Sequence, residues 1–371
     1  MATSSTTTSR NTTSDNTASN DARSNNSGSA EMSSDWAIPP HVGILRILNG
    51  AHVAGAVSCL AQLGIPDLLE NGPKSAEELA DQIGAQPDAL YRLMRATACV
   101  GVLTEDSEGR FSQTPMSAVL CRDAQPSLRG LAVMGGREWH GRGWSHLGYC
   151  VKTGKQAIDK IHGMPIFDFF SNNPEEAKIF DDAMTGLSTI DGPAVANAYN
   201  FEGIRSIVDV GGGRGLLLAT LLEKNAHLKG TLYEVPRVLE GAKNGALKPF
   251  IDRGRCGVEC GDMFSTIPTG ADAYIMKHIL HDWPDDACIK ILAACRKGVN
   301  LGGKMLVVDC VIQPGNQFAP AKFLDLQMLI FPSGRERTQA EFRELFAAAG
   351  WKLSRVIPTA AADSIIEGVT A

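Results

Sequence analysis

The segment Asp209-Val-Gly-Gly-Gly-Arg-Gly215 constrains the fold of this chain more than any other feature of the sequence. It follows the apolar run 207–210 and precedes the apolar helical segment 216–222. Glycines at such a junction permit a tight turn, and the start of the helix presents backbone N–H groups that have no partner within the helix. The segment therefore predicts a strand, a turn and a helix that together bind a ligand.

Three further short apolar runs, at residues 229–233, 273–276 and 304–308, are separated by helical segments. Short apolar runs that alternate with helices are typical of a parallel sheet covered by helices on both faces. From about residue 205 onward, the sequence thus predicts an α/β fold with a doubly wound, Rossmann-like sheet. In such a fold the ligand lies beyond the carboxyl ends of the strands.

The region before this sheet is predicted to be mainly α-helical. Residues 42–63 carry apolar residues at helical spacing, with small residues among them. Two shorter helices are predicted at 75–83 and 87–100, and a β-hairpin at 102–113. Helix, turn, helix and hairpin are the pattern of a winged-helix module. Residues 129–200 are again predicted to be helical.

Winged-helix modules also occur in transcription regulators, and the second short helix carries Arg92 and Arg95. A helix that enters a major groove is expected to lie in a positive field. Here the whole chain has a net charge of -6, and five acidic residues surround the two arginines: Asp81, Asp88, Glu105, Asp106 and Glu108. We therefore expect no nucleic acid partner.

Residues 1–35 consist mostly of Ser, Thr, Asn, Ala and Gly. This composition buries too little apolar surface to offset the chain entropy of folding, so a disordered tail is predicted. A Ser-rich start is also compatible with an organelle transit peptide, although Arg10 and Arg23 are its only basic residues. We identify no apolar run of about twenty residues, and the nine cysteines form no CxxC pair. A cytoplasmic protein without a membrane partner is expected.

The glycine-rich turn has the pattern G-x-G-x-G, with Leu216 where the dinucleotide fingerprint requires Gly, and no Gly-Lys-Ser/Thr triplet follows. NAD and P-loop nucleotides are therefore not expected. Glu234 ends the next strand, where a carboxylate can accept hydrogen bonds from ribose hydroxyls. Asp262 follows a third predicted strand, where it can accept from an adenine amino group while Met263 or Phe264 covers the ring. Taken singly, a solvated strand end and a helix cap are the simpler interpretations of the two acids. Together they favour an adenosine nucleoside.

With these motifs the sequence resembles the class of small-molecule O-methyltransferases typified by plant caffeate and flavonoid enzymes and bacterial polyketide-tailoring enzymes. The resemblance covers residues 36–371. It rests on Asp209-Val-Gly-Gly-Gly-Arg-Gly215, Tyr233-Glu-Val-Pro236, Gly261-Asp-Met-Phe264, Met276-Lys-His-Ile-Leu-His-Asp-Trp283, Gly302-Gly-Lys304 and Gly334-Arg-Glu-Arg-Thr338.

This resemblance implies a winged-helix domain at 36–128 used for homodimerisation and an O-methyltransferase domain at 129–371. It also implies S-adenosylmethionine as the cofactor, S-adenosylhomocysteine as its product, and no metal. The implied cofactor contacts are Gly211, Glu234, Asp262, Met263 and Lys277, to which we add Asp209, Gly213 and Phe264 from the same motifs. The family more often has Asp at the position of Glu234, but the longer carboxylate still reaches ribose oxygens.

His281 follows the strand at 273–276, where a doubly wound fold places its chemistry, and histidine suits proton removal near neutrality. A phenol with a pKa of about 10 facing an imidazole with a pKa of about 6.5 makes complete prior proton transfer uphill by roughly 5 kcal/mol. We therefore expect His281 to take the proton as the hydroxyl oxygen attacks the methyl carbon.

Two carboxylates that orient this base are implied by the resemblance, and they fall on Asp309 and Glu336. A carboxylate on one imidazole nitrogen fixes the tautomer and stabilises the cation. Asp309 is shorter than the Glu of the plant enzymes, which favours Glu336 as the carboxylate that orients the base. His278 is interpreted as a satisfied polar residue. Asp282 is either a cap for the helix near Pro284 or part of the catalytic set.

The acceptor pocket is expected to have flat apolar walls and thioether contacts, because the acceptor is expected to be aromatic. The candidate residues, each of which could equally be helix core, are Met134, Trp139, Trp144, Phe170, Met184 and Met328. Two alternatives to O-methylation stay open. One is a dimeric binding module that has lost catalysis. The other is different chemistry on the same cofactor, such as N-methylation, decarboxylation or hydroxylation.

Overall fold

The computed structural model describes residues 38–370, so the predicted tail at 1–35 lies outside the described residues. The chain divides into two units, residues 1–47 and 48–371. Helix α1 (Pro40–Gln62) starts in the first unit and ends in the second. By length and composition α1 could cross a membrane. Our expectation that no run of this length exists was therefore wrong, because the 23 residues of α1 are apolar enough on average although Arg46 and Asn49 interrupt the run. One such helix is weak evidence for a membrane span, because helices of soluble proteins can have the same length and composition.

The second unit begins with the predicted winged helix. Ser75 caps α3 by accepting the Glu78 N–H, and the Glu78 side chain accepts the Ser75 N–H in return. Strands β1 and β2 pair antiparallel, which confirms the hairpin. The elements of this region are α2 (Ile65–Leu68), α3 (Ala76–Ile83), α4 (Pro87–Ala98), β1 (Leu103–Glu105), β2 (Phe111–Gln113) and α5 (Pro115–Ala118).

Six helices connect the winged helix to the sheet, as predicted for residues 129–200. They are α6 (Arg129–Gly135), α7 (Glu138–Ser145), α8 (Leu147–Thr153), α9 (Ala157–His162), α10 (Ile166–Asn172) and α11 (Pro174–Ala198). Their aromatic residues form one core with Ile330 and Phe331. The long helix α11 also contributes Val195 and Ala196 to the core of the sheet domain, so it links the helical region to the sheet.

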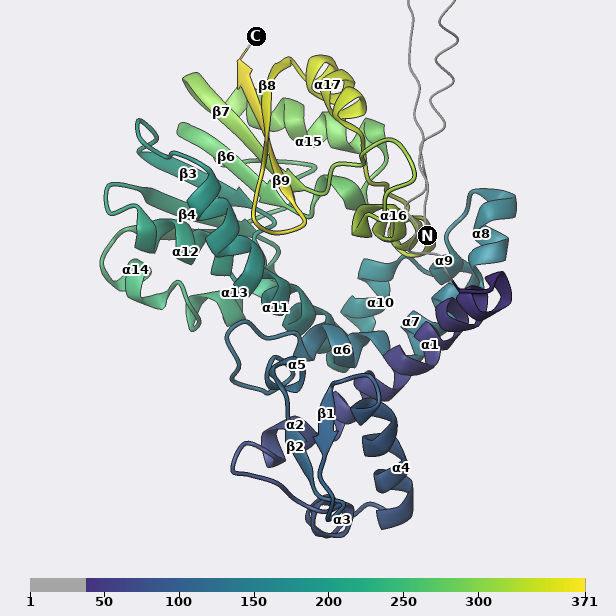
Figure 1. Ribbon diagram of the computed structural model, residues 1–371. Coiled ribbons are helices and arrows are strands. Elements are labelled where there is room, and N and C mark those ends of the chain that lie inside the picture. Colours follow the sequence, from purple (N-terminus) through teal and green to yellow (C-terminus); the bar gives the residue numbers. More distant parts are fainter. Residues whose placement is uncertain (1–37, 371) are drawn as a thin grey trace, which may run out of the picture. The chain divides into compact units, whose positions relative to one another are not determined.

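The sheet has seven strands in the order β5-β4-β3-β6-β7-β9-β8 (Figure 1). Strands β5, β4, β3, β6 and β7 are parallel, and β9 pairs antiparallel with both β7 and β8. Their bounds are β3 (Ser206–Val210), β4 (Lys229–Glu234), β5 (Cys256–Cys260), β6 (Ala271–Lys277), β7 (Val299–Asp309), β8 (Trp351–Pro358) and β9 (Ser364–Thr370). The parallel part confirms the predicted doubly wound sheet, whereas the antiparallel strands β8 and β9 were not predicted.

Helices cover both faces of this sheet. Residues of α11 to α14 pack on one face and residues of α15 and α17 on the other, which gives two separate apolar cores. The helices are α12 (Leu216–Lys224), α13 (Pro236–Lys243), α14 (Lys248–Asp252), α15 (Asp285–Gly298), α16 (Pro320–Ile330) and α17 (Gln339–Ala348). The chain runs outward from β3 through β4 to β5 and then returns to β6 on the other side of β3. This switch of direction opens the crevice where a doubly wound fold binds its ligand.

Candidate active site

The residues predicted to hold the cofactor lie at the carboxyl ends of four neighbouring strands. Asp209 lies in β3, Glu234 ends β4, and Lys277 ends β6. The segment 261–264 directly follows β5. Since β5, β4, β3 and β6 are adjacent in the sheet, the fold brings these residues to one edge, as the sequence predicted.

The glycine-rich turn after β3 is tied to Glu234. The Gly213 N–H donates to Glu234 Oε1 at 3.1 Å, and Gly213 has a φ of 60°, which favours glycine. At Gly211, an added Cβ would lie 2.5 Å from Ile279 Cδ1, so this turn has no room for a side chain. Burial raises the pKa of Glu234. Glu234 is therefore a half-buried partner of the turn and not a freely solvated strand end.

Asp209 is fully buried, yet neither of its carboxylate oxygens has a hydrogen-bond partner among the described residues. Burial and the nearby Glu234 charge raise its pKa to about 7, against the opposing effect of Lys277. A buried carboxylate without partners is costly. A ligand that brings a positive charge or N–H donors to the glycine-rich turn would lower this cost.

Asp262 lies in the turn after β5, where its Oδ1 accepts the Phe264 N–H at 2.9 Å. This is the capping interaction that we considered as the simpler interpretation. The side chain is exposed, so its second oxygen can still bind a ligand. The Phe264 ring stands edge-on to Trp283, with ring centroids 4.7 Å apart. Met263, which lies between Asp262 and Phe264 in the sequence, is half-buried.

His281 lies in the short 3-10 turn η2 (Leu280–Asp282) that follows β6. Its Nδ1 and Glu336 Oε1 are 2.7 Å apart, and both side chains are buried. Because Glu336 accepts the Nδ1 proton, Nε2 is the nitrogen that can take a proton from another molecule. Burial by itself lowers the pKa of His281, but the nearby carboxylates of Asp282, Glu336 and Asp309 outweigh it and raise the pKa to about 10.

Asp309 does not contact His281 directly, contrary to its predicted orienting part. It ends β7, where its Oδ1 accepts the His278 N–H at 3.0 Å, and its Oδ2 has no partner within residues 38–370. Burial raises its pKa well above the usual range, against the opposing charge of His281. Aspartate is one methylene shorter than glutamate, and the described contact of Asp309 with this turn is the hydrogen bond to His278, while its charge contributes to the raised pKa of His281.

Asp282 does not cap helix α15, so that interpretation is wrong. The residue at the N-cap position is Pro284, and the helix start has no side-chain cap. Instead, Asp282 Oδ1 lies 3.6 Å from His281 Nε2. Burial raises the pKa of Asp282 to about 6, against the opposing charge of His281.

Two residues of the segment 334–338 hold the turn that carries His281, and we did not assign either of them from the sequence. Arg337 is 1% exposed and donates to the carbonyl oxygens of Leu280, at 2.9 Å, and Trp283, at 3.0 Å. An added Cβ on Gly334 would lie 1.8 Å from the His281 carbonyl oxygen. The signal was present, because both residues belong to the motif that contains Glu336.

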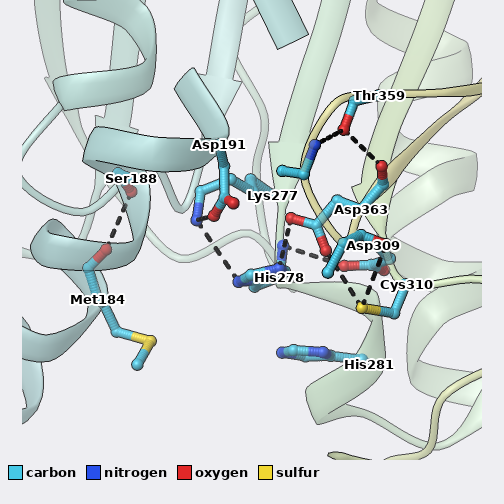
Figure 2. Close-up of polar contacts among 12 residues, drawn as sticks. Met184, Ser188, Asp191, Lys277, His278, His281, Asp309, Cys310, Thr359 and Asp363 are labelled. Atoms are coloured by element: carbon cyan, nitrogen blue, oxygen red, sulfur yellow. Dashed lines mark hydrogen bonds and ion pairs between the residues drawn. The ribbon is translucent and has the colours of Figure 1, made fainter. Parts of the chain in front are cut away.

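His278 is satisfied, as predicted, within a chain of polar contacts shown in Figure 2. Its Nε2 lies 2.9 Å from Asp363 Oδ2, and its Nδ1 lies 3.4 Å from Lys277 Nζ. Lys277 Nζ also lies 3.2 Å from Asp191 Oδ2, on helix α11. The His278 ring stacks on His281 with centroids 5.1 Å apart. Neither Asp191 nor Asp363 was identified from the sequence.

A largely apolar cavity lies beside Asp282 and contains four of the six predicted acceptor residues. They are Met134, Trp139, Phe170 and Met328; Trp144 and Met184 do not line it. Further lining residues that we did not predict are Ile166, Phe167, Phe180, Gln327, Phe331 and Pro332. The indole N–H of Trp139 donates to Glu176 at 3.0 Å. This bond fixes the Trp139 ring, which stands edge-on to the Phe170 ring.

The sheet order, the glycine-rich turn and the acids at successive strand ends define the class of methyltransferase-type nucleoside-binding folds. Comparison with known families adds two matches: an O-methyltransferase domain over residues 144–352 and an O-methyltransferase dimerisation domain over residues 45–123. The chain therefore belongs to the O-methyltransferase family and is an S-adenosylmethionine-dependent O-methyltransferase. The winged-helix segment matches the dimerisation domain, which gives it a role that needs no DNA.

Individual relatives agree with this assignment. A phenazine O-methyltransferase of Lysobacter antibioticus is 37% identical over 331 residues, which is 89% of this chain and 96% of the relative. A mitomycin biosynthesis 6-O-methyltransferase of Streptomyces lavendulae is 37% identical over 319 residues, 85% of this chain and 90% of the relative. A crystal structure of an O-methyltransferase from neocarzinostatin biosynthesis, in complex with S-adenosylmethionine and 2-hydroxy-5-methyl naphthoic acid, superposes with a TM-score of 0.74. It is 31% identical, over 90% of this chain and 100% of that chain.

The residues present fit S-adenosylmethionine, the cofactor of this family. An added Cβ on Gly213 would meet no atom within 4 Å, so the turn is open at this residue, and Asp209 offers a buried carboxylate without partners among the described residues. A cofactor that carries a sulfonium and an ammonium group would compensate this negative charge.

Proposed function

We propose that this chain transfers the methyl group of S-adenosylmethionine to a hydroxyl of a small aromatic acceptor, with His281 as the general base. The observation that carries the proposal is the buried pair of His281 and Glu336. The Nε2 atom of His281 lies near Asp282, and Asp282 lines the aromatic cavity. One relative is a phenazine O-methyltransferase, and the enzyme from neocarzinostatin biosynthesis is bound to 2-hydroxy-5-methyl naphthoic acid, which supports an aromatic acceptor here.

S-adenosylmethionine, when bound, supplies a methyl group that is activated by the positive charge on sulfur. The protein contributes the proton acceptor. Glu336 holds the His281 ring through Nδ1, so that Nε2 would face the acceptor hydroxyl and take its proton as the oxygen–carbon bond forms and the sulfur–carbon bond breaks, with S-adenosylhomocysteine as the leaving group. Glu336 and Asp282 stabilise the imidazolium that results, because each places a carboxylate near the ring.

The raised pKa of His281 has a consequence for this mechanism. With a pKa of about 10, the ring is protonated at neutral pH in the free protein and cannot accept a proton. A positive charge brought to the adjacent cofactor site lowers the pKa of a nearby cation. We infer that His281 loses its proton when S-adenosylmethionine binds, and that the base becomes active only in the complex.

A panel of phenols incubated with methyl-labelled S-adenosylmethionine tests the proposal, with label transfer read by mass. Methylated phenol with S-adenosylhomocysteine as co-product is expected, and His281→Ala should abolish most of it. Label on an amine and not on any hydroxyl would favour N-methylation. Cofactor binding without label transfer to any acceptor would favour the non-catalytic binding module.

We also propose that the chain is a cytoplasmic homodimer formed through residues 36–128, with the methyltransferase domain at 129–371. The dimerisation match and the exposure of helix α1 support this, since Leu48 is 62% exposed and Val53 is 36% exposed. A monomer seldom leaves such apolar surface open to water. The composition and the net charge of -6 support our expectation that neither nucleic acid nor a membrane is a partner.

A further inference from the structure

We propose that Asp191 binds the ammonium group of the cofactor's amino-acid end, so that Asp191 and Lys277 together form a paired charge site for that zwitterion. The inference rests on the proposed use of S-adenosylmethionine as methyl donor. It assigns to helix α11 a direct part in cofactor binding, in addition to the strand ends of the sheet.

The packing of α11 against the sheet does not by itself require the buried ion pair of Asp191 and Lys277. The two side chains are each 9% exposed, and Lys277 Nζ lies 3.2 Å from Asp191 Oδ2. Removing two charges from water is unfavourable, and the attraction between them often does not offset this. Replacement by apolar residues would therefore hold α11 to the sheet at least as well, so a pair in this place points to a ligand.

The position of the pair agrees with a ligand at the sheet edge. Lys277 ends β6, and its neighbour β3 carries Asp209, whose carboxylate has no partner among the described residues. Asp191 comes from α11 and faces Lys277 (Figure 2). The Lys277 ammonium group thus lies near the carboxylates of Asp191 and Asp209, and Asp363 lies within 4.8 Å of Asp191, so carboxylates outnumber ammonium groups at the ends of β3 and β6.

The hydrogen bonds of Lys277 leave it one donor for a ligand. An ammonium group has three N–H donors. One points to Asp191 and a second to His278 Nδ1, while the other nitrogen of His278 bonds to Asp363. Lys277 makes no third hydrogen bond within the described part of the chain. This N–H is available to a carboxylate.

Asp191 likewise has a hydrogen-bond partner for only one of its two carboxylate oxygens. Its Oδ2 accepts from Lys277, whereas its Oδ1 has no hydrogen-bond partner in residues 38–370. Burial raises the pKa of Asp191, against the opposing charge of Lys277. A second cation beside Oδ1 would therefore stabilise this carboxylate. The amino-acid end of the cofactor offers an ammonium group for Asp191 and a carboxylate for Lys277, which is the complementary arrangement.

Calorimetry with three nucleosides tests this assignment. S-adenosylhomocysteine carries both charges of the amino-acid end, its decarboxylated analogue carries only the ammonium group, and 5′-methylthioadenosine carries neither. Asp191→Asn should weaken the first two by roughly 10- to 100-fold, the range for a charge-assisted hydrogen bond. It should leave the affinity for 5′-methylthioadenosine unchanged. Lys277→Gln should weaken S-adenosylhomocysteine alone.

Two controls keep the test independent of folding. Asp168→Asn removes the same charge from an exposed position on α10 and should leave all three affinities unchanged. Asp191→Glu keeps the charge and should restore part of the preference for an ammonium group. The affinity for 5′-methylthioadenosine reports in every variant whether the nucleoside site is still folded.

Equal weakening of all three ligands by Asp191→Asn would overturn the assignment and leave Asp191 as a structural partner of Lys277. Unchanged affinity for S-adenosylhomocysteine in that variant would overturn it as well. In both cases the wild-type protein still binds S-adenosylhomocysteine, so the proposed function stands. Failure of the wild-type protein to bind S-adenosylhomocysteine would instead overturn the proposed function and the inference together.

Discussion

Replacing Glu336 with glutamine changes the charge beside the base while keeping the shape of the side chain. In the structure, Glu336 accepts the Nδ1 proton of His281 across 2.7 Å. A glutamine oxygen can accept the same proton, so the ring keeps its orientation. The variant therefore isolates the contribution of the negative charge.

The magnitude follows from the pKa of His281. The rise from the reference value of 6.5 to about 10 corresponds to roughly 5 kcal/mol in favour of the protonated ring, to which three carboxylates contribute. A hydrogen bond to a charged group exceeds a neutral one by about 1 kcal/mol or somewhat more. We therefore expect Glu336→Gln to lower the maximal turnover roughly tenfold, because the imidazolium formed during transfer is less stable.

Glu336→Gln should also shift the pH dependence of kcat. Only the neutral ring takes a proton, so kcat rises as pH increases through the pKa of His281 in the complex. Without the Glu336 charge this pKa is lower. The rise in kcat of the variant should therefore occur at lower pH than in the wild type, although its plateau is lower.

The assay is kcat against pH at saturating cofactor and acceptor, with an acceptor whose hydroxyl stays protonated throughout. Glu344→Gln, an exposed residue on α17, removes the same charge elsewhere and should match the wild type. The double variant of His281→Ala and Glu336→Gln should be no slower than His281→Ala alone, because the two residues act as one unit. A pH profile that does not move, or losses that multiply in the double variant, would refute this account.

Four further outcomes are expected. His281→Ala should lower kcat by about 10²- to 10⁴-fold with cofactor affinity nearly intact by calorimetry; full activity on an acceptor that stays protonated would contradict the mechanism. Burial raises the pKa of Asp209 to about 7. The stability that its protonated form contributes is therefore fully present at pH values below the pKa of Asp209 in the unfolded chain, and it is lost as pH rises through about 7. Asp209→Asn should therefore stabilise the free protein at pH 8 by up to about 4 kcal/mol, with little gain near pH 4; equal shifts in Tm at both pH values would contradict this. Leu48→Asp, on the exposed part of α1, should yield monomers by light scattering, and a persistent dimer would show that the interface lies elsewhere. Deleting residues 1–35 should leave the dimer and the activity unchanged, and a loss of either would give the tail a function.

The cofactor half of the site could be predicted because each of its residues follows a strand by a fixed local pattern. The glycine-rich turn, Glu234 and Asp262 lie at the carboxyl ends of β3, β4 and β5, which are neighbours in the sheet. Once the strands are identified as parallel, their carboxyl ends meet without further information. The predicted residues therefore lie together, although the structure adds that Glu234 also binds the backbone of the turn.

The acceptor half was less predictable, because its residues come from separate helices. Four of six candidates line the cavity, whereas Trp144 and Met184 do not. An apolar residue in a helix has the same pattern whether it faces a cavity or a core. Only the packing of α6, α7, α10 and α16 decides which side chains border open space.

By itself the sequence determined the parallel strands β3 to β7 with the helices between them, the motifs at their carboxyl ends, and His281 as the candidate base, since local patterns encode all three. The tertiary structure decided which carboxylate holds that base. The resemblance implied both Asp309 and Glu336 and favoured Glu336 for its length, and in the structure only Glu336 reaches Nδ1, because Arg337 and Gly334 bring the segment 334–338 against the turn of His281. It also decided that Asp191 meets Lys277 across 86 residues of chain. Contacts between distant segments depend on how helices pack on the sheet, and no local pattern records that packing.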